Sequence, residues 1–415
     1  MAQGTEHRFD YPSVAHAECP FPVLADIRAH GSVHRIGDED RFLVCSYEAV
    51  DHVFRHPELF SNCSEQRIQP FDWPGPEGVP PESLGPRTGR VLNVIELDPP
   101  HHKPRRERMF SLIKPARLTS MRPWITELVD TLIDGFIDRG EVELMSELAY
   151  PLPTHVVIRL LGLEPEDFEW MHAWGVVEWS GGALYMSAQE RARQSPAAES
   201  AGPLLTAAIL DRVGSQRDDG LSEVIEAQIA DDGAFNLGIV RADVGQFVRA
   251  GITTTGHLLS SAMLLLLRHP EIMREVGEDH SKLRLMLEEA LRLESPLQWI
   301  PRIAREDVEL DGVAIPKGSY LIMMIQSANR DEAKWGEGAR RFEPGRDNVI
   351  DHLGFGKGVH FCLGATLGRI EAQTAFERLF TRLRNIRLAE GEEPRHMPSP
   401  TLRGLQHLRL EFDRA

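Results

Sequence analysis

Apolar positions recur with a helical period over most of this chain, and they alternate only in a few short stretches. The helical pattern runs through residues 118–210 with short interruptions, then through 237–268, and then through 271–293. The segment 237–268 predicts a long buried core helix rather than a membrane span. Its most apolar part, Leu258 to Leu267, is too short to cross a bilayer and is broken by two serines.

Alternating patterns predict a minor β region. The strand signals lie at residues 32–36, 41–45 and 300–325, at Arg387, and at residues 408–410. The first two flank a polar turn and predict a hairpin. No internal repeat or low-complexity linker divides the chain. We therefore predict a mainly α fold with small β-sheets, formed by one domain over residues 1–415 in which residues 1–20 are a loosely ordered N-terminal arm.

A long irregular segment covers residues 61–97, which are rich in proline and glycine and have little periodicity. Segments of this kind in compact proteins are often binding loops or lids. Phe71 and Trp73 lie within it. These two side chains either cap a pocket or pin the loop to the core, and the sequence supports both interpretations equally.

The composition argues against several classes of function. The chain has 415 residues, of which 42% are hydrophobic, and its formal net charge is −17 at pH 7. So acidic a protein is a poor candidate for binding nucleic acid or anionic membranes. Its four cysteines form no CxxC pair, so neither a zinc site nor a disulfide framework is indicated. The polar N-terminus has no apolar signal segment, and we expect a cytoplasmic protein.

One loop near the C-terminus carries the strongest chemical signal. Its sequence is Phe355-Gly-Lys-Gly-Val-His-Phe-Cys-Leu-Gly364, and a helical pattern follows it. Glycines permit a tight, preformed loop, and a cysteine at a helix start has its thiolate stabilised by backbone N–H groups. Cys362 is therefore predicted to be a metal ligand or a nucleophile. The alternative is a buried structural cysteine.

Three weaker motifs precede this loop in a fixed order. The first interrupts the long core helix with residues that are unfavourable there, which often marks a functional site. The second is an i,i+3 ion pair, and the third supplies an arginine that would complete a network with that pair. These motifs are Ala250-Gly251-x-x-Thr254, Glu289-x-x-Arg292 and Phe342-x-Pro344-x-Arg346.

A basic cluster also stands out in this acidic chain. Asp98-Pro99-Pro100 is suited to begin a helix. The cluster follows it and is either a solvent-exposed charged face or a binding surface for an anion or an acidic partner. Its members are His101, His102, Lys103, Arg105, Arg106 and Arg108.

In this order and spacing, the motifs resemble those of the cytochrome P-450 family, the haem-thiolate monooxygenases, and of its soluble bacterial kind above all. The resemblance extends from Pro22 to Leu410. It implies a fold in which haem b lies between a long central helix and a proximal cysteine loop. It also implies oxidation of a small molecule with O2, using electrons from a ferredoxin and its NAD(P)H-dependent ferredoxin reductase.

The resemblance assigns roles residue by residue. Cys362 would be the thiolate ligand of the haem iron, which favours O–O cleavage, and Phe355 would pack beside the sulfur. Buried propionates need cationic, hydrogen-bonding partners. Those partners would be His102, Arg106, Arg302 and His360, and the cofactor-binding set also includes Gly356, Gly364 and Ala250.

The same resemblance implies supporting roles for other charged residues. Glu289, Arg292 and Arg346 would hold the loop beneath the haem without taking part in catalysis. A second basic set is either a docking face for an acidic ferredoxin or scattered solubilising charge. This set consists of Arg105, Arg108 and Lys357.

The chain departs from the family pattern on its central helix. The family's oxygen-activating motif has an acid before the threonine, but here Thr253 precedes Thr254. Both residues remain catalytic candidates, although ordinary hydroxylation should be slower or less coupled unless another group supplies protons. Gln246 and Arg249 also replace apolar residues that commonly line the pocket.

A buried arginine requires an anion or several acceptors. We therefore expect Arg249 to anchor a polar or carboxylate-bearing substrate, unless it pairs with an acid of a neighbouring helix. Hydroxylation in bacterial secondary metabolism or catabolism is the predicted activity. Oxidative coupling, ring formation and non-catalytic haem-ligand binding remain alternatives. The candidate substrate pocket comprises Phe71, Trp73, Gln246, Arg249, Leu297, Gln298, Trp299 and Leu402.

Overall fold

The computed structural model describes residues 18–37, 40–62, 91–179, 200–215, 217–397, 399 and 401–415. The predicted N-terminal arm up to residue 17, and both Phe71 and Trp73, lie outside the described residues. The helices are α1 (Phe21–Ala29), α2 (Tyr47–Arg55), α3 (His102–Phe110), α4 (Pro115–Asp134), α5 (Pro151–Leu161), α6 (Phe168–Trp179), α9 (Gly220–Asp232), α10 (Leu237–Arg268), α11 (Pro270–Glu278), α12 (Leu283–Leu293), α13 (Ile325–Ala328), α14 (Glu332–Trp335) and α15 (Ala365–Arg382).

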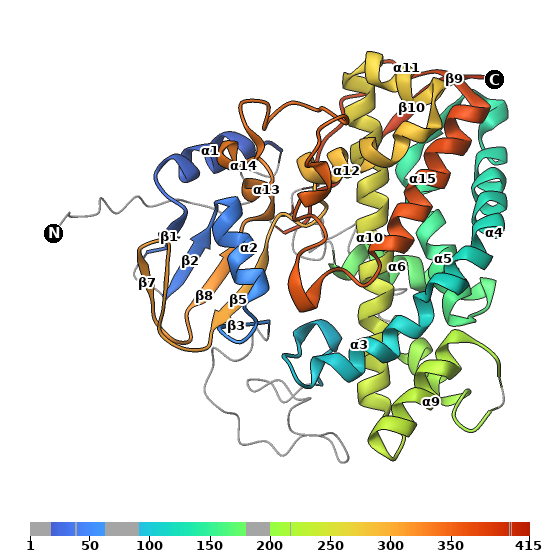
Figure 1. Ribbon diagram of the computed structural model, residues 1–415. Helices are drawn as coiled ribbons and strands as arrows, with labels where there is room; N and C mark the ends of the chain where they lie inside the picture. The colour runs from blue at the N-terminus through green and yellow to red at the C-terminus, as the bar shows by residue number, and fades with distance from the viewer. Residues whose placement is uncertain are drawn as a thin grey trace.

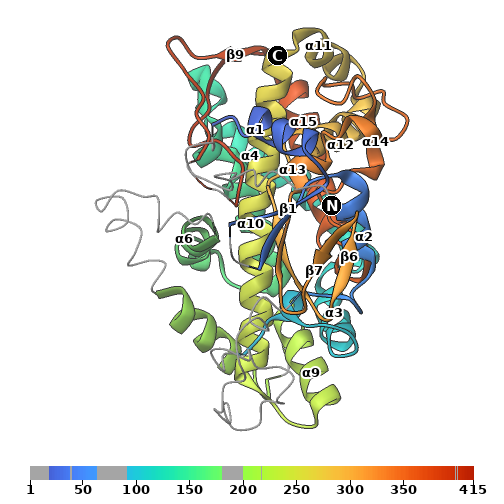
Figure 2. The same cartoon turned by 90° about the vertical axis from the view of Figure 1, so that its left-hand side faces the viewer.

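The helical body is organised around α10. Its bounds match the long core helix predicted from the sequence, and Asn236 caps its N-terminus by accepting a hydrogen bond from the Ile239 amide at 3.1 Å. In Figures 1 and 2, α10 runs the length of the molecule, with α9 beside one end and α11 beside the other. Helices α5, α6, α12 and α15 also pack on it. The prediction of a buried core helix is therefore confirmed.

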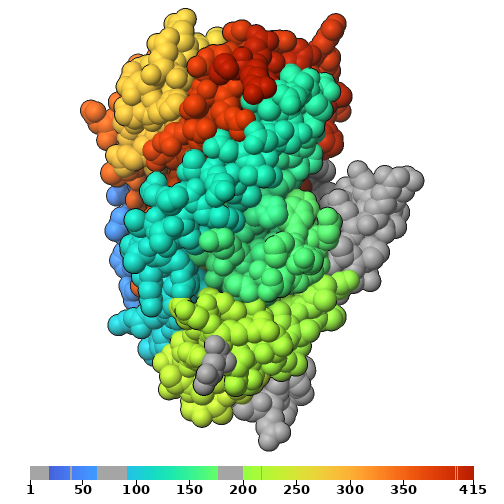
Figure 3. All heavy atoms as spheres, turned by 90° about the vertical axis from the view of Figure 1, so that its right-hand side faces the viewer, coloured from blue at the N-terminus to red at the C-terminus, as the bar shows by residue number. Residues whose placement is uncertain are grey.

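By length and composition alone, α10 could cross a membrane, but 78% of its most apolar window is buried inside the protein. Figure 3 shows one outer face of the helical body, where α4 (teal) runs beside the red C-terminal segment. Helices α4 and α15 pack directly against each other. The apolar surface of α10 is thus covered by other helices of the same chain.

Strands form three small sheets. A five-stranded sheet has the order β1-β2-β8-β5-β3, in which β2 and β8 are parallel and the other pairs antiparallel. In Figure 1 it lies to one side of the helical body, together with α1 and α2. The strands are β1 (Val33–Arg35), β2 (Arg41–Val44), β3 (Phe60–Ser61), β4 (Glu141–Glu143), β5 (Ile300–Ala304), β6 (Val308–Leu310), β7 (Val313–Ile315), β8 (Tyr320–Met323), β9 (Leu383–Leu388) and β10 (Arg409–Arg414).

The strand predictions are largely confirmed. The hairpin is β1–β2, and β6 pairs with β7 across Asp311 and Gly312, which both have positive φ. The predicted C-terminal sheet is β9–β10, and the sequence analysis missed β4, which joins it as a third strand. The mainly α fold with small β-sheets is as predicted.

The helix start predicted at Asp98 is wrong. The helix begins at His102, and the Asp98 carboxylate instead accepts hydrogen bonds from the Ser61 hydroxyl at 2.5 Å and the Asn62 amide at 2.9 Å. Asp98 therefore ties the end of β3 to the segment that leads into α3. The sequence pattern could not show this contact because its partners lie more than thirty residues away.

Candidate functional site

The cysteine loop has the tight geometry that its glycines suggested. Gly356 and Gly358 have φ values of 66° and 68°, a region that disfavours other residues. The Cys362 amide donates to the Phe355 carbonyl at 2.8 Å and closes the loop. A Cβ on Gly358 would lie 2.3 Å from the Phe54 carbonyl oxygen of α2. The loop therefore needs glycine at 358 both for its backbone angle and for its contact with α2.

Cys362 lies just before α15, as predicted. Burial raises the pKa of its thiol, while the backbone N–H of Gly364 and the guanidinium of Arg106 act in the opposite direction. The residue as a whole is nevertheless exposed. The sulfur thus lies among protein atoms while part of Cys362 stays open. Such a thiol can bind a soft metal centre as thiolate, with backbone N–H groups stabilising the charge.

A group of basic side chains lies around this loop. The His102 ring of α3 and the His360 ring have centroids 4.1 Å apart, and Arg106 donates to the Phe361 carbonyl at 2.7 Å. Arg302 of β5 is only 3% exposed, and its guanidinium lies 5.2 Å from the centroid of the Phe54 ring. Segments distant in sequence thus bring all four predicted propionate partners together.

One member of this basic group, His360, lacks a matching acceptor in the described part of the chain. Both ring nitrogens of His360 are buried without a hydrogen-bond partner there. Burial, reinforced by the positive charges of its neighbours, lowers the pKa of His360 to about 2 and that of His102 to about 4. Burial also lowers the pKa of Arg302 to about 10. Unpaired buried donors of this kind are normally satisfied by an anion.

These observations fit the haem that the sequence predicted. The described residues contain no group of three or more His, Cys, Asp or Glu side chains that would hold a metal ion alone. Haem requires no such group, because the porphyrin supplies the other ligands and one cysteine suffices. His102, Arg106, Arg302 and His360 would pair with its carboxylates, and Cys362 would contact its metal.

Adjacent threonines on α10 make different contacts. Thr254 is half-buried, and its hydroxyl donates to the Ala250 carbonyl at 2.7 Å. Thr253 is fully buried, and its hydroxyl donates to the Gly175 carbonyl of α6. A Cβ on Gly175 would lie 2.9 Å from Ile252, so glycine permits this close helix contact. The Thr253 side chain therefore connects two helices, which the sequence pattern did not reveal.

Two predicted pocket residues lie one turn apart on α10. The Arg249 Nη2 donates to the Gln246 Oε1 at 3.3 Å. The Arg249 guanidinium also lies 5.2 Å from the centroid of the Trp174 ring of α6. Gly245 allows this approach, since a Cβ there would lie 2.8 Å from the Trp174 ring. Trp174 and Gln246 thus orient the Arg249 side chain.

The other pocket candidates separate into two groups. Leu297 and Leu402 pair in an isolated β-bridge, and the buried Gln298 amide donates to the carbonyls of Ser399 and Leu402 at 2.9 and 3.2 Å. Gln298 therefore anchors the C-terminal loop. Trp299 instead packs on the cluster formed by α1, β2 and β8. Leu297, Gln298 and Leu402 therefore connect two distant segments, as the predicted pocket requires, whereas Trp299 does not.

Buried ion pairs support the cysteine loop. Arg292 binds Glu289 through two hydrogen bonds of 2.7 Å, and Arg346 approaches the same carboxylate at 3.5 Å, as predicted. A second network was not predicted: Glu288 binds Arg369 of α15 at 2.6 and 2.9 Å and His352 at 2.9 Å. Two successive glutamates on one helix were the only sequence signal for it.

The suggested docking face is wrong for two of its three residues. Arg105 is buried and binds Asp243 of α10 through hydrogen bonds of 2.8 and 2.6 Å. Arg108 is also buried, and it binds Asp231 and Asp232 of α9. These arginines hold α3 against α9 and α10, so they offer no charge to a partner surface.

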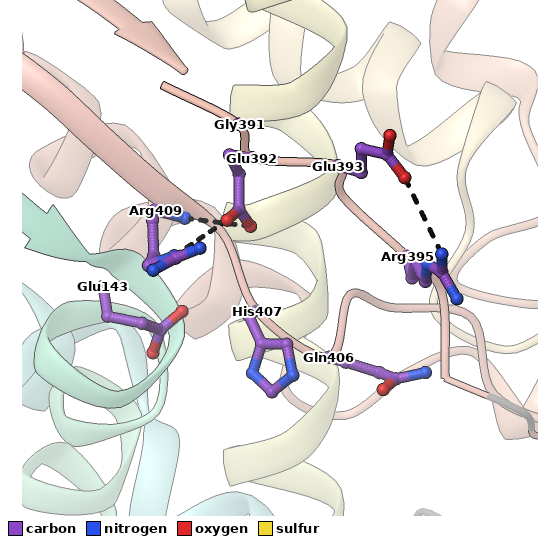
Figure 4. Close-up of a pocket in the computed structure, with 8 residues that line it drawn as sticks. All are labelled: Glu143, Gly391, Glu392, Glu393, Arg395, Gln406, His407 and Arg409. Atoms are coloured by element: carbon purple, nitrogen blue, oxygen red, sulfur yellow. Dashed lines mark hydrogen bonds and ion pairs between the residues drawn. The ribbon is translucent and has the colours of Figure 1, made fainter. Parts of the chain in front are cut away.

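A separate pocket of about 530 Å³ lies by the C-terminal sheet. Figure 4 shows Glu392 paired with Arg409 and Glu393 paired with Arg395. The Glu392–Arg409 contact is 2.8 Å. The lining residues are Glu143, Gly391, Glu392, Glu393, Arg395, Gln406, His407 and Arg409. None of the predicted site residues lines it, so it is distinct from the candidate site.

Comparisons with known proteins agree with this geometry. A family model described as Cytochrome P450 matches residues 205–409. The 6-deoxyerythronolide B hydroxylase of Saccharopolyspora erythraea is 30% identical, and the match covers 90% of this chain and 91% of the relative. The cytochrome P450 monooxygenase PikC of Streptomyces venezuelae is also 30% identical, over 95% of this chain and 91% of the relative.

A solved structure shows the same fold. The cytochrome P450 enzyme CxnD, described as acting in C–S bond formation in chuangxinmycin biosynthesis, is 28% identical to this chain. The match has a TM-score of 0.82 and covers 99% of this chain and 100% of CxnD. The similarity thus includes both the helical body and the small sheets.

Proposed function

This chain belongs to the cytochrome P450 family, and we propose that Cys362 is its thiolate ligand to the iron of haem b. The family consists of haem b proteins, and the relatives found here are named monooxygenases and hydroxylases, so the chain is an oxidoreductase of this class. The observation that carries the assignment is the half-buried His360 ring beside the cysteine loop, whose two buried nitrogens have no partner among the described residues and lie among basic side chains. We further propose that residues 1–415 act as one domain.

Each part of this site has a distinct role in the proposal. When bound, haem supplies the reductive activation of O2, which a thiolate ligand favours. The N–H groups of Gly364 and Ala365 stabilise negative charge on Cys362. His102, Arg106, Arg302 and His360 hold the haem carboxylates and fix its orientation. Phe355 covers the sulfur, and Ala250, Gly356 and Gly364 leave room for the cofactor.

Thr254 is proposed to act on the oxygen-activating side. Its half-buried hydroxyl lies on the helix face that also includes the half-buried Ala250 and Gly251. A hydroxyl there orients water and passes on a proton. Thr253, the other catalytic candidate from the sequence, acts in this proposal by fixing α6 against α10.

The substrate class follows from Arg249. A half-buried guanidinium oriented by Trp174 and Gln246 supports recognition of a carboxylate or of several acceptor groups. We propose a small polar or carboxylate-bearing organic molecule of bacterial secondary metabolism, hydroxylated with O2. Phe71, Trp73, Leu297, Gln298, Trp299 and Leu402 remain proposed pocket residues.

A second reaction class is supported by one comparison. CxnD, whose structure matches nearly the whole chain, is described as forming a C–S bond. The acid of the usual relay is absent at Thr253, and weak proton supply would favour oxidative coupling over hydroxylation. Product analysis distinguishes the two, because hydroxylation adds one oxygen atom and coupling adds none.

The proposed partners are a ferredoxin and its NAD(P)H-dependent reductase, and the proposed location is the cytoplasm. Arg105 and Arg108 cannot contribute to docking, because both are buried in ion pairs. Of the predicted docking residues, Lys357 of the cysteine loop remains. Reduction by surrogate ferredoxins at increasing ionic strength tests the partner, since a docked charge pair weakens with salt.

The carbon monoxide spectrum tests the assignment of Cys362. The reduced carbon monoxide complex of the wild type should show the red-shifted Soret band of a thiolate ligand, and Cys362→Ser should lose it. Cys45→Ser, which alters a buried cysteine near β2, should keep it. A wild-type spectrum without that band would contradict the assignment.

The substrate proposal needs its own titration. Arg249→Ala should weaken spectral binding of carboxylate-bearing ligands by about tenfold or more, whereas Arg249→Lys should retain part of the affinity. Neutral analogues should bind all three proteins alike. Equal affinity of a carboxylate ligand for wild type and Arg249→Ala would contradict the anchoring role.

A further inference from the structure

Tyr150 and His257 form a hydrogen-bonded pair inside the protein that no role described above uses. The Tyr150 hydroxyl lies 3.1 Å from Nε2 of the His257 ring. Tyr150 is 8% exposed, and His257 on α10 is fully buried. Tyr150 stands where the π-helix Met145–Ala149 ends and α5 begins, and π-helical turns are frequent at functional sites.

Two glycines make room for this pair. A Cβ on Gly256 of α10 would lie 2.6 Å from the Tyr150 ring. A Cβ on Gly404, in the C-terminal loop, would lie 2.3 Å from the His257 ring. Each ring therefore lies directly against backbone, where a larger residue would displace it. Three segments distant in sequence thus enclose the pair and hold its hydrogen bond in one geometry.

The His257 ring is neutral at pH 7. Burial lowers its pKa to about 4, and the charge of His396 adds to this effect, while a backbone hydrogen bond with Arg403 opposes it. A neutral imidazole carries a proton on one nitrogen and accepts at the other. We assign Nε2 as the acceptor, because the Tyr150 hydroxyl has no other partner among the described residues. Were Nε2 the donor, the phenol proton would be buried without an acceptor.

The pair lies near the proposed oxygen-activating side. Gly256, on which the Tyr150 ring packs, follows Thr254 by two residues on α10. Besides His257, the ring partner of Tyr150 in the described part of the chain is His172 of α6, with centroids 5.9 Å apart. A phenol is more readily oxidised than an imidazole. An electron removed from this group is therefore lost by Tyr150 and not by its neighbours.

The sequence of α10 creates a need for such a group. Thr253 stands where the family has an acid, and its hydroxyl donates to the Gly175 carbonyl of α6, so it holds no proton to deliver. Turnover with a weak proton supply leaves some oxidising equivalents unused. They then oxidise susceptible groups nearby, and a cysteine thiolate such as Cys362 is one of these. A phenol that is oxidised first spares the thiolate.

We propose that Tyr150 and His257 are a redox-active pair that takes up the oxidising equivalent of a turnover that has not reached product. Tyr150 gives one electron to the oxidised haem, its O–H bond breaks, and the proton moves to Nε2 of His257. The distance of 3.1 Å is within the reach of direct proton transfer. The products are a neutral phenoxyl radical and an imidazolium.

The cycle closes with the redox partners already proposed. One electron from the ferredoxin returns the radical to the phenol, and the proton moves back from Nε2 to the Tyr150 oxygen. The histidine is essential, because a phenol that loses an electron becomes a strong acid and needs a base within reach. This inference rests on the proposed function, since it requires haem bound at Cys362.

The chain offers a matched control for the pair. Tyr150→Phe keeps the ring and removes the hydroxyl, and His257→Gln keeps an acceptor that cannot take up a proton. Tyr47→Phe is the control, because burial also raises the pKa of Tyr47, as it does for Tyr150. The Tyr47 hydroxyl, however, donates to the Asp351 carbonyl at 2.8 Å, and a carbonyl is no base for its proton.

The first measurement detects the radical and does not depend on turnover. Wild-type holoenzyme without substrate, treated with peracetic acid and frozen, should show the electron paramagnetic resonance signal of a tyrosyl radical. Tyr150→Phe and His257→Gln should lose this signal, and Tyr47→Phe should keep it. In D2O, the wild-type radical should show coupling to an exchangeable deuteron, which is the one held by His257. An equal signal in wild type and Tyr150→Phe would overturn the proposal.

The second measurement is the number of turnovers completed before the enzyme is inactivated, with surrogate redox partners. Tyr150→Phe and His257→Gln should be inactivated about tenfold sooner, because Cys362 is then open to oxidation. Product formed per NADPH in the first turnovers should match wild type, since the pair takes no part in the productive reaction. If Tyr150→Phe survives as long as wild type and Tyr47→Phe, the protective role is wrong.

The carbon monoxide spectrum separates this inference from the proposed function. A wild-type protein with thiolate-ligated haem but without a tyrosyl radical would overturn the redox-active pair alone. A wild-type protein without the thiolate band would overturn the haem assignment, and the pair with it.

Discussion

The guanidinium of Arg369 lies over the ring of Phe355, with its central carbon 4.5 Å from the ring centroid. The same guanidinium binds Glu288 of α12, and the Phe355 carbonyl accepts the Cys362 amide. Arg369 therefore links α12 and α15 to the residue that closes the cysteine loop. It is also one of the positive charges that favour a thiolate at Cys362.

Replacement of Arg369 should change the reduction potential of the haem iron. In Arg369→Leu the thiolate loses a nearby positive charge, so the reduction potential of the haem iron should become more negative. Arg369→Lys should show a smaller change, because it keeps the charge but loses the bidentate contact. Spectroelectrochemical titration measures both. Arg378→Leu is the control. It changes another arginine of α15, breaks that residue's ion pair with Asp130 of α4, and should leave the potential unchanged.

Haem retention should depend on Arg302. The side chain is buried beside the unpartnered His360, and its loss would leave one haem carboxylate without its cation. Arg302→Leu should therefore release haem about tenfold faster or more, as measured by transfer to apomyoglobin. Arg305→Leu changes an arginine three residues further along that pairs with Asp98 at 3.7 Å. If the two variants released haem equally fast, the proposed contact between Arg302 and a haem carboxylate would be contradicted.

Gly358 should tolerate no larger residue. Gly358→Ala adds a Cβ 2.3 Å from the Phe54 carbonyl oxygen at a φ of 68°. Both the clash and the backbone angle oppose the change, and the free energy of unfolding should fall by about 2 kcal/mol or more. Gly202→Ala is the matched control, because nothing lies within 4 Å of its Cβ and it sits in a helix. That variant should be neutral or slightly more stable in thermal unfolding.

Much of this structure could be predicted from local patterns in the sequence. The 32 residues of α10 are bounded as predicted, because an apolar helix with a capping asparagine is specified by its own sequence. The cysteine loop was likewise visible, since its glycines are required by positive φ angles within a few residues. Features of this kind depend on neighbours along the chain, which a sequence displays directly.

Features that depend on distant partners were missed or misread. Arg105 and Arg108 looked like surface charge, because their acids lie on α9 and α10 more than a hundred residues away. Thr253 looked like half of a catalytic pair, because the sequence could not show that its hydroxyl donates to the Gly175 carbonyl of α6.

Acid should remove the contribution of Glu288 to stability. Burial alone would raise the pKa of Glu288. Hydrogen bonds from Arg369 and His352 instead hold this pKa at about 2, below the value of 4.5 in an unfolded chain. The contribution is therefore present above pH 4.5 and is lost as the pH falls towards 2. Glu288→Gln should be less stable than wild type at pH 7, and the gap should narrow on acidification. The exposed Glu309→Gln should show no such narrowing.

Glu371 should give the opposite pH dependence. This residue of α15 is 1% exposed, and burial raises its pKa to about 8, above the unfolded value of 4.5. The folded state therefore keeps a proton that the unfolded chain releases. The contribution is therefore full below pH 4.5 and is lost as the pH rises through 8. Glu371→Gln removes this decline, so its thermal unfolding temperature relative to wild type should rise steadily from pH 5 to pH 8. Parallel pH profiles for the two proteins would mean that Glu371 is ionised when folded, which would contradict its raised pKa.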